Sequence, residues 1–185
     1  DVYPSAARLA IVFAAKPLKE AILNLQRSLA AKGQEFGGIL KMGRTQLQDA
    51  VPMTLGQEFN AFASDVGSEI AQIEQACLQL CELNLGGTAI GTGINAPKGY
   101  ASLAISELAD ISGLPVTLAD DLIAASADMG AFITFSGVLK RLSIKLSKLS
   151  NDLRLLSSGP RTGLGEINLP AMQPGSSIMP GKVNP

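Results

Sequence analysis

The last eleven residues of the chain, 175–185, combine a flexible backbone, two neighbouring hydroxyls and one cation in the order Gly-Ser-Ser-Ile-Met-Pro-Gly-Lys-Val-Asn-Pro. Gly175 and Gly181 permit backbone angles and close approaches that a side chain forbids, so successive N–H groups could converge on an anion. Lys182 would add a positive charge, and Ser176 and Ser177 would supply hydroxyls. Although Gly-Ser-Ser alone is a weak signal, the whole segment predicts a loop that handles a carboxylate or a phosphate.

A second polar segment, residues 41–59, is rich in Thr, Gln and Asp but carries few unbalanced charges. Its composition is typical of a connection between two helices, in which such side chains cap backbone groups. Thr54 stands three residues before Gln57, which is the spacing of a capping box at the start of a helix. From composition alone we expect a structural connection here rather than a binding site.

The composition is that of a globular protein with few means of binding nucleic acid. Of 185 residues, 46% are hydrophobic and 17% are charged, which is enough apolar material for one domain with a real core. A formal net charge of -1 and 4% aromatic residues provide neither a basic surface nor stacking platforms for bases. No uninterrupted apolar run is long enough to span a membrane. We therefore expect a cytoplasmic protein with no nucleic-acid or membrane partner.

The types of titratable residue narrow the chemistry further. The chain contains no histidine, which removes the commonest metal ligand and the usual base of a nucleophilic serine. A zinc site and a hydrolase triad are therefore excluded. Cys77 and Cys81 stand one helical turn apart, where a disulfide would be strained, so we expect two buried free thiols.

Apolar residues recur with helical spacing over three long stretches, which predicts an all-α fold built as a long-helix bundle. The first stretch covers residues 4–32 and the second residues 54–83. In the second, the apolar positions alternate in steps of three and four, as in the seam of a helix bundle. This seam is expected to consist of Leu55, Phe59, Phe62, Val66, Ile70, Ile73, Cys77 and Leu80.

The third stretch, residues 118–156, predicts one continuous helix of about 60 Å at about 1.5 Å per residue. A compact domain of this size has a radius of gyration of only about 16 Å, so one chain could not bury the whole apolar face of such a rod. We therefore expect helices of other chains to cover it. A shorter helix is expected over residues 100–111, closed by Gly113 and Pro115.

Glycines cluster in residues 86–93, which read Gly-Gly-Thr-Ala-Ile-Gly-Thr-Gly. A phosphate-binding loop would follow a strand and open a helix with a defined signature, and no strand pattern precedes this segment. We expect close helix packing or a helix break instead. No repeat or linker divides the chain, so the sequence predicts a single helical-bundle domain over residues 1–185, with a terminal loop at residues 158–185.

Several segments together resemble the fumarase/aspartase superfamily. Residues 175–185 resemble its signature loop, and residues 43–49 (Gly-Arg-Thr-Gln-Leu-Gln-Asp) resemble its second conserved segment in the form found among aspartate ammonia-lyases. Residues 87–93 are similar to its glycine-rich element, residues 151–161 to the lead-in to the loop, and residues 1–4 to the end of a Ser-Ser/Thr-Asn-Asp segment. The resemblance covers essentially the whole chain, which we expect to be an internal fragment of a longer subunit and the central helical domain of that fold.

The resemblance implies removal of a group beta to a carboxylate and release of fumarate, with no cofactor and no metal site. Taking a proton from the carbon beside a carboxylate creates an enediolate, which needs a base and several preorganised donors. By carry-over from the family, Ser176 is the expected catalytic base, and its alkoxide would need backbone N–H groups and a cation nearby. The alternative for Ser176 is a turn hydroxyl that bonds its own backbone.

The same carry-over assigns substrate contacts to five further residues. Lys182 and Asn184 are expected to hold the carboxylate beside the enediolate, Ser177 to donate to the other carboxylate, and Thr45 to bond on the alpha-carboxylate side. Gln46 stands where fumarases usually have histidine, and a glutamine can donate and accept but cannot carry a proton at neutral pH. This departure favours loss of ammonium, which leaves already protonated, over loss of water.

The implied complete protein is an ammonia-lyase that converts L-aspartate to fumarate and ammonia. The family forms homotetramers whose active sites combine segments of three subunits, so Thr45 and Ser176 would meet across chains. The fragment by itself is expected to be inactive. Two alternatives stay open: a fumarase acting on L-malate, and a non-catalytic helical oligomerisation scaffold that merely retains the motifs.

Overall fold

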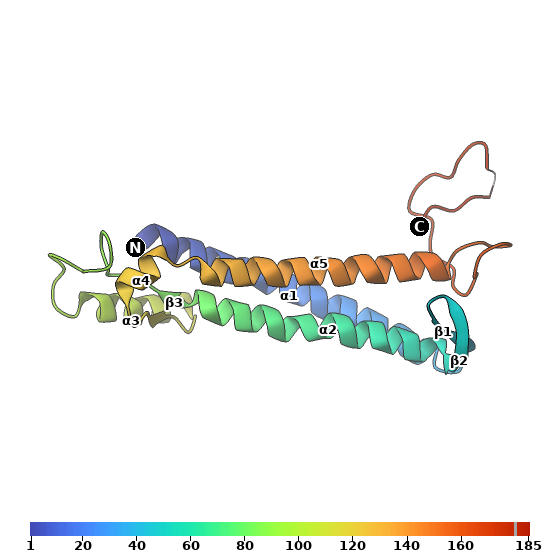
Figure 1. Cartoon of the computed structure of the whole chain (residues 1–185), viewed down its shortest axis with the longest axis horizontal. Helices are drawn as coiled ribbons and strands as arrows, with labels where there is room; N and C mark the ends of the chain where they lie inside the picture. Colours follow the sequence, from blue (N-terminus) through green and yellow to red (C-terminus); the bar gives the residue numbers. More distant parts are fainter. Residues whose placement is uncertain (180) are drawn as a thin grey trace. The chain divides into compact units, whose positions relative to one another are not determined.

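The structure is a computed structural model that describes residues 1–179 and 181–185. Helices dominate it, with four short strands between them (Figure 1). The elements in chain order are α1 (Val2–Glu35), β1 (Leu40–Thr45), β2 (Gln48–Thr54), α2 (Leu55–Leu80), β3 (Glu82–Leu83), α3 (Tyr100–Ser112), β4 (Thr117–Leu118), α4 (Leu122–Ala127) and α5 (Gly130–Leu156). The predicted all-α class is confirmed, and Pro180 of the terminal segment lies outside the described residues.

Helices α1 and α2 pack side by side and run in opposite directions, joined by the β1–β2 hairpin (Figure 1). The predicted capping box is present at the start of α2, because Thr54 Oγ1 accepts from the Gln57 N–H and the Gln57 side chain accepts from the Thr54 N–H. At the start of α1, the Asp1 carboxylate accepts from the Val2 N–H at 2.7 Å. Both long helices therefore begin where side-chain oxygens satisfy backbone donors that the helix itself leaves open.

The buried face of α2 differs from the predicted seam at three positions. Leu55, Phe59, Val66, Ile73 and Leu80 are buried as expected. The other predicted seam residues, Phe62, Ile70 and Cys77, are only half-buried, whereas Ala63, Glu69 and Ala76 are buried. The prediction failed at these positions because it followed hydrophobicity alone and passed over small residues and a paired charge.

The predicted continuous helix over residues 118–156 is wrong. The structure has α4 and α5 instead, separated at Asp128, whose backbone is extended (φ -77°, ψ 125°). The Asp128 carboxylate accepts from the Gly130 N–H at 3.0 Å, and the Asp121 carboxylate caps the start of α4 through the N–H groups of Ile123 and Ala124. These local bonds replace helix hydrogen bonds, which aspartate side chains readily do. At about 1.5 Å per residue, α5 spans about 40 Å rather than 60 Å.

The end of the α1–α2 pair away from the hairpin carries α3, α4 and the glycine-rich segment 86–93 (Figure 1). The predicted helix over residues 100–111 is confirmed as α3, which ends at Gly113 in a left-handed conformation (φ 63°). Two-residue strands β3 and β4 pair in parallel just before the glycine-rich segment and before α4, which the sequence did not predict. The glycine-rich segment is followed by turns rather than by a helix, because α3 begins only at Tyr100.

The chain forms two compact units, residues Asp1–Leu142 and Ser143–Pro185, with the division inside α5. The first contains the hairpin and the second contains the terminal segment. A single domain over residues 1–185 stays a prediction. Over the described ranges, each helix is too short or too polar to cross a bilayer.

Candidate active site

Thr45 and Gln46 lie at the tip of the β1–β2 hairpin. The strands pair antiparallel, with Thr45 opposite Gln48 at the tip and Leu40 opposite Thr54 at the base. A bulge between Met42 and Arg44 interrupts the ladder. Thr45 and Gln46 are exposed to solvent, so the hairpin presents both side chains outward from the fold.

The two residues of the hairpin turn, Gln46 and Leu47, adopt left-handed backbone angles with φ of 51° and 63°. Two-residue hairpins favour this turn because its twist matches that of the strands, and they normally place Asn or Gly there. A side chain in this region costs about 1 kcal/mol or more, so the pairing of the strands must hold Gln46 in place. The sequence predicted a helix connection here, and the hairpin was missed because the usual Asn-Gly signal is absent.

The hairpin is fixed to the helices at its base. The Leu55 N–H donates to the Ile39 carbonyl at 2.9 Å, and the Gly56 N–H donates to the Phe36 carbonyl at 3.0 Å. The Lys41 ammonium, with only 7% of its side chain exposed, forms an ion pair with Glu58 of α2. These bonds tie the strands to both long helices, so the position of Thr45 and Gln46 follows from the packing of α1 on α2.

Ser176 is half-buried in the terminal segment, and its hydroxyl oxygen accepts from the Ile178 N–H at 3.3 Å. Its carbonyl accepts from the Met179 N–H at 3.3 Å. The first bond is the one that the turn-hydroxyl alternative requires. It is also a backbone donor aimed at the oxygen that would carry negative charge in an alkoxide, so the same bond serves a catalytic base.

Asn184 closes the terminal segment into a loop. Its carbonyl accepts from the N–H groups of Met172 and Gln173 at 2.9 and 3.2 Å, and its side-chain amide donates to the Pro174 carbonyl at 2.9 Å. Where the two sides of the loop meet, a Cβ on Gly175 would stand 2.6 Å from the Lys182 carbonyl oxygen. Glycine at position 175 is therefore required for this closure.

Lys182 lies beside two hollows of the second unit. It lines a pocket of about 560 Å³ together with Asn168 and Met179. It also lines a neighbouring hollow of about 550 Å³ together with Asn184 and Arg154. Ser176 and Ser177 belong to the lining of neither hollow. In this conformation the structure brings Lys182 and Asn184 to one hollow and leaves the two serines outside it.

The six predicted site residues are thus divided between the two units. Thr45 and Gln46 belong to the first, and the remaining four, Ser176, Ser177, Lys182 and Asn184, belong to the second. Each unit supplies groups that could bind an anion, namely a hydroxyl and an amide from the hairpin, and hydroxyls, backbone N–H groups and an ammonium from the loop.

The two thiols are present as free cysteines, with Cys81 buried and Cys77 half-buried. Burial raises the pKa of both thiols above the usual value, which keeps them protonated and weakly nucleophilic at neutral pH. Within residues 1–179 and 181–185, no group of three His, Cys, Asp or Glu side chains is placed to hold a metal ion.

One contact of the glycine-rich segment was not predicted. The Asp1 carboxylate accepts from the N–H groups of Gly86 and Thr88 at 3.0 and 3.1 Å, as well as from Val2. The segment therefore holds a carboxylate of this chain and links the start of α1 to the region after α2. An Asp immediately before an apolar helical run was the available signal for the cap, but the long-range bonds have no signature in the sequence.

Comparison with known proteins extends over the entire chain. The model of a family described as Lyase matches residues 1–185. The chain is 62% identical over 186 residues to the aspartate ammonia-lyase of Pseudomonas aeruginosa and 56% identical over 185 residues to that of Escherichia coli. All of the chain aligns in both cases, and it spans 39% of the length of each of these curated relatives.

The chain belongs to the fumarase/aspartase superfamily of lyases. Two solved structures of this superfamily superimpose on all of it. A fumarate lyase:delta crystallin from Brucella melitensis bound to cobalt has a TM-score of 0.95 and 58% identity, and the chain covers 40% of it. A class II fumarase from Schistosoma mansoni has a TM-score of 0.89 and 38% identity, and the chain covers 42% of it.

Membership of the superfamily confirms the fold expected from the resemblance, a central domain built as a helical bundle. The roles of the individual site residues stay predictions.

Proposed function

We propose that this chain is part of an aspartate ammonia-lyase, which converts L-aspartate to fumarate and ammonia. The observation that carries the proposal is the 62% identity over the whole chain to an enzyme of that name. One loop of this chain carries four of the predicted site residues, Ser176, Ser177, Lys182 and Asn184. The close approach at Gly175 and the side-chain bond of Asn184 close this loop. Such a loop combines the hydroxyls, backbone donors and cation that elimination from a dicarboxylic amino acid requires.

Ser176 acts as the base in the proposed reaction. As an alkoxide, its oxygen takes a proton from Cβ of L-aspartate, and the electron pair of the C–H bond moves into the adjacent carboxylate to form an enediolate. The enediolate then returns the pair to form the double bond of fumarate, while the bond from Cα to nitrogen breaks, its electron pair stays on nitrogen and neutral ammonia leaves. The Ile178 N–H, 3.3 Å from the Ser176 oxygen, supports the alkoxide before the proton is transferred.

Positive charge and donors must meet the two carboxylates of the substrate. Lys182 supplies the only ammonium of residues 175–185 and lines the same hollow as Asn184, so these two residues hold the carboxylate beside the enediolate. Ser177 donates to the other carboxylate, and Thr45 bonds on the alpha-carboxylate side. Bonds that strengthen as the enediolate forms lower the barrier more than bonds of equal strength in both states.

Gln46 favours ammonia over water as the leaving group. L-Aspartate carries its amino group as ammonium at neutral pH, so this group leaves without an added proton. Hydroxide leaving from L-malate needs a proton, and a glutamine at the hairpin tip cannot deliver one. A fumarase is the second candidate, and it is supported by the 38% identity to the class II fumarase.

The proposed enzyme is a cytoplasmic homotetramer with active sites shared between subunits. The exposed apolar residues of α5 support an assembly, because Ile133 and Ile144 are 70% and 60% exposed in the single chain. Apolar side chains of this size on a long helix are typical of surfaces that another helix covers. A shared site also accounts for the division of the site residues between two units.

The test is an assay of the full-length protein with L-aspartate and, separately, with L-malate, followed by the ultraviolet absorbance of fumarate. The proposal expects rapid fumarate formation from L-aspartate and little from L-malate. Preference for L-malate would identify a fumarase. Absence of fumarate with both substrates from a folded protein would favour the non-catalytic scaffold.

A further inference from the structure

A carboxylate lies at the centre of the apolar face of α2. Glu69 is fully buried at 0% exposure, between Val66 at 1% and Ile73 at 0% on the same face. Burying a charge is unfavourable unless a partner compensates it. The position of Glu69 among core residues therefore calls for a specific contact from a neighbouring helix.

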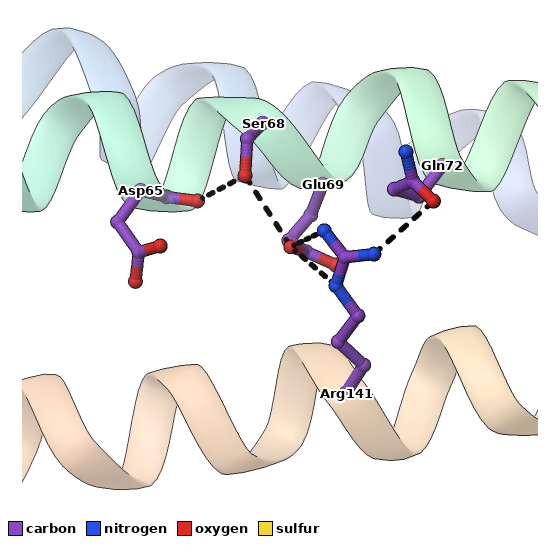
Figure 2. A network of polar contacts seen from close by, with 5 residues as sticks. All are labelled: Asp65, Ser68, Glu69, Gln72 and Arg141. Atoms are coloured by element: carbon purple, nitrogen blue, oxygen red, sulfur yellow. Dashed lines mark hydrogen bonds and ion pairs between the residues drawn. The ribbon is translucent and has the colours of Figure 1, made fainter.

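Arg141 of α5 provides that contact through a fork of donors (Figure 2). Its Nε and Nη2 atoms lie 3.1 and 3.0 Å from Glu69 Oε1, and its Nη1 atom donates to Gln72 Oε1 at 3.1 Å. The Ser68 hydroxyl also donates to Glu69 Oε1 at 3.4 Å. One guanidinium from α5 thus bonds two side chains one helical turn apart on α2.

The observed axial position of α5 along α2 lets one guanidinium bond both Glu69 and Gln72. Apolar contacts are non-directional and recur every turn, so a slip of about 5.4 Å would replace one apolar contact by another. The same slip would move the guanidinium away from Glu69 and leave a buried carboxylate without its fork. Buried polar groups specify helix register in this way, whereas their net contribution to stability is often small.

We propose that the Glu69–Arg141 pair fixes the register of α5 on α2 and that Arg141 is thereby a positioning residue for the terminal segment. Helix α5 continues from Arg141 to Leu156, and the loop that carries Ser176 follows it in the chain. The link to catalysis rests on the proposed function. A pair that merely added stability would have no effect on activity once stability was restored by other means.

The experiment replaces both charges in the full-length protein by leucine, as Glu69→Leu with Arg141→Leu. The unfolding midpoint is expected to stay near that of the wild type, since leucine at the buried position 69 removes a carboxylate whose burial is unfavourable, while position 141 is 46% exposed. The value of kcat/KM for L-aspartate is expected to fall at least tenfold, mainly through kcat. A structure of the variant is expected to show α5 displaced along α2 or in more than one register.

The matched control is the ion pair between Lys19 and Glu74, which also joins two helices at 3.0 Å. The two pairs differ in the burial of the carboxylate, because Glu74 is 53% exposed and Glu69 is 0% exposed, whereas Lys19 and Arg141 are both partly exposed, at 29% and 46%. Replacing both Lys19 and Glu74 by leucine should leave kcat/KM and register unchanged. Arg141→Lys keeps the charge and loses the fork, so it should fold and show a smaller fall in kcat/KM. That single variant keeps the test decisive if the leucine pair does not fold.

The proposal would be overturned if the Glu69→Leu, Arg141→Leu double variant kept the native register and the native kcat/KM. An Arg141→Lys enzyme with unchanged kinetics and register would overturn it as well. Failure of the wild-type protein to release fumarate would overturn the proposed function alone. A structure of the double variant would still test whether the Glu69–Arg141 pair fixes the register, because a structure can be compared without any measurement of activity.

Discussion

The β1–β2 hairpin and the terminal loop each carry predicted site residues, and they are held in different ways. The hairpin is a ladder of paired strands fixed at its base by backbone bonds to Ile39 and Phe36 and by the Lys41–Glu58 ion pair. The loop is closed mainly by Asn184, with two turns around Ser176 and Lys182. The hairpin is therefore preformed by strand pairing, whereas turns and the contacts of Asn184 hold the loop over its described residues.

This difference indicates that the hairpin and the loop contribute to substrate binding in different ways. A preformed hairpin can orient one carboxylate of a substrate at no further cost in conformational entropy. Ser176 and Ser177 stand outside the two hollows that Lys182 lines. Ordering this loop around the substrate would bring the base and the cation together only when the substrate is present.

Removal of the Ser176 hydroxyl should have the largest effect. In the full-length protein, Ser176→Ala is expected to lower kcat by about 10²- to 10⁴-fold, because a positioned base contributes that much. The hairpin and the helices should keep their structure, as judged by circular dichroism. Ser150→Ala, which removes an exposed hydroxyl bonded to the Leu146 carbonyl, is the control and should keep full activity. A Ser176→Ala enzyme with native kcat would exclude this residue as the base.

Removal of the loop cation should have the next largest effect. Lys182→Met is expected to lower kcat/KM by about 10- to 100-fold, since a hydrogen bond to a charged group contributes about 1.5–3 kcal/mol. Lys148→Met removes an exposed ammonium from α5, where it pairs with Asp152, and should change kcat/KM little. Equal effects of the two substitutions would mean that Lys182 acts only through net charge.

A change at the hairpin tip should alter specificity more than rate. Gln46→His introduces a group that can carry a proton, and histidine tolerates the left-handed backbone better than most side chains. The ratio of kcat/KM for L-malate to that for L-aspartate is expected to rise several-fold. An unchanged ratio in a correctly folded variant would show that position 46 does not act on the leaving group.

The smallest effect is expected at the base of the hairpin. Thr54→Ala removes the helix cap of α2, which should cost about 1 kcal/mol in the free energy of unfolding. Because Thr54 also ends β2, KM for L-aspartate should rise slightly. Asp121→Ala removes the cap of α4 and should lower the thermal midpoint without changing KM. Identical KM values for the two variants would argue against a link between hairpin rigidity and substrate binding.

Some elements could be predicted from the sequence because their signals are local. Helix α2 was predicted because Thr54 and Gln57 have capping-box spacing ahead of a regular apolar stripe. The break at Asp128 was missed because the apolar stripe continues across it, whereas the side-chain bond of Asp128 to the Gly130 N–H follows from no apolar pattern. The buried Glu69 was missed because hydrophobic spacing does not reveal a charge that a distant arginine compensates.

The candidate site shows the same contrast. The resemblance to family motifs predicts the types of these residues and their order along the chain. The left-handed turn at Gln46 has no signal in the sequence, since it depends on strand pairing around it. The close approach of Gly175 to the Lys182 carbonyl likewise depends on contacts between residues that are separated in the chain.

A crystal structure of the full-length protein with a bound dicarboxylate inhibitor would test the central claim most directly. The account predicts that the loop encloses the inhibitor, with the Ser176 oxygen about 3–3.5 Å from the carbon that corresponds to Cβ and Lys182 on a carboxylate. A complex in which the inhibitor is bound with the loop closed, but another group occupies that position and Ser176 points away from the carbon, would contradict it.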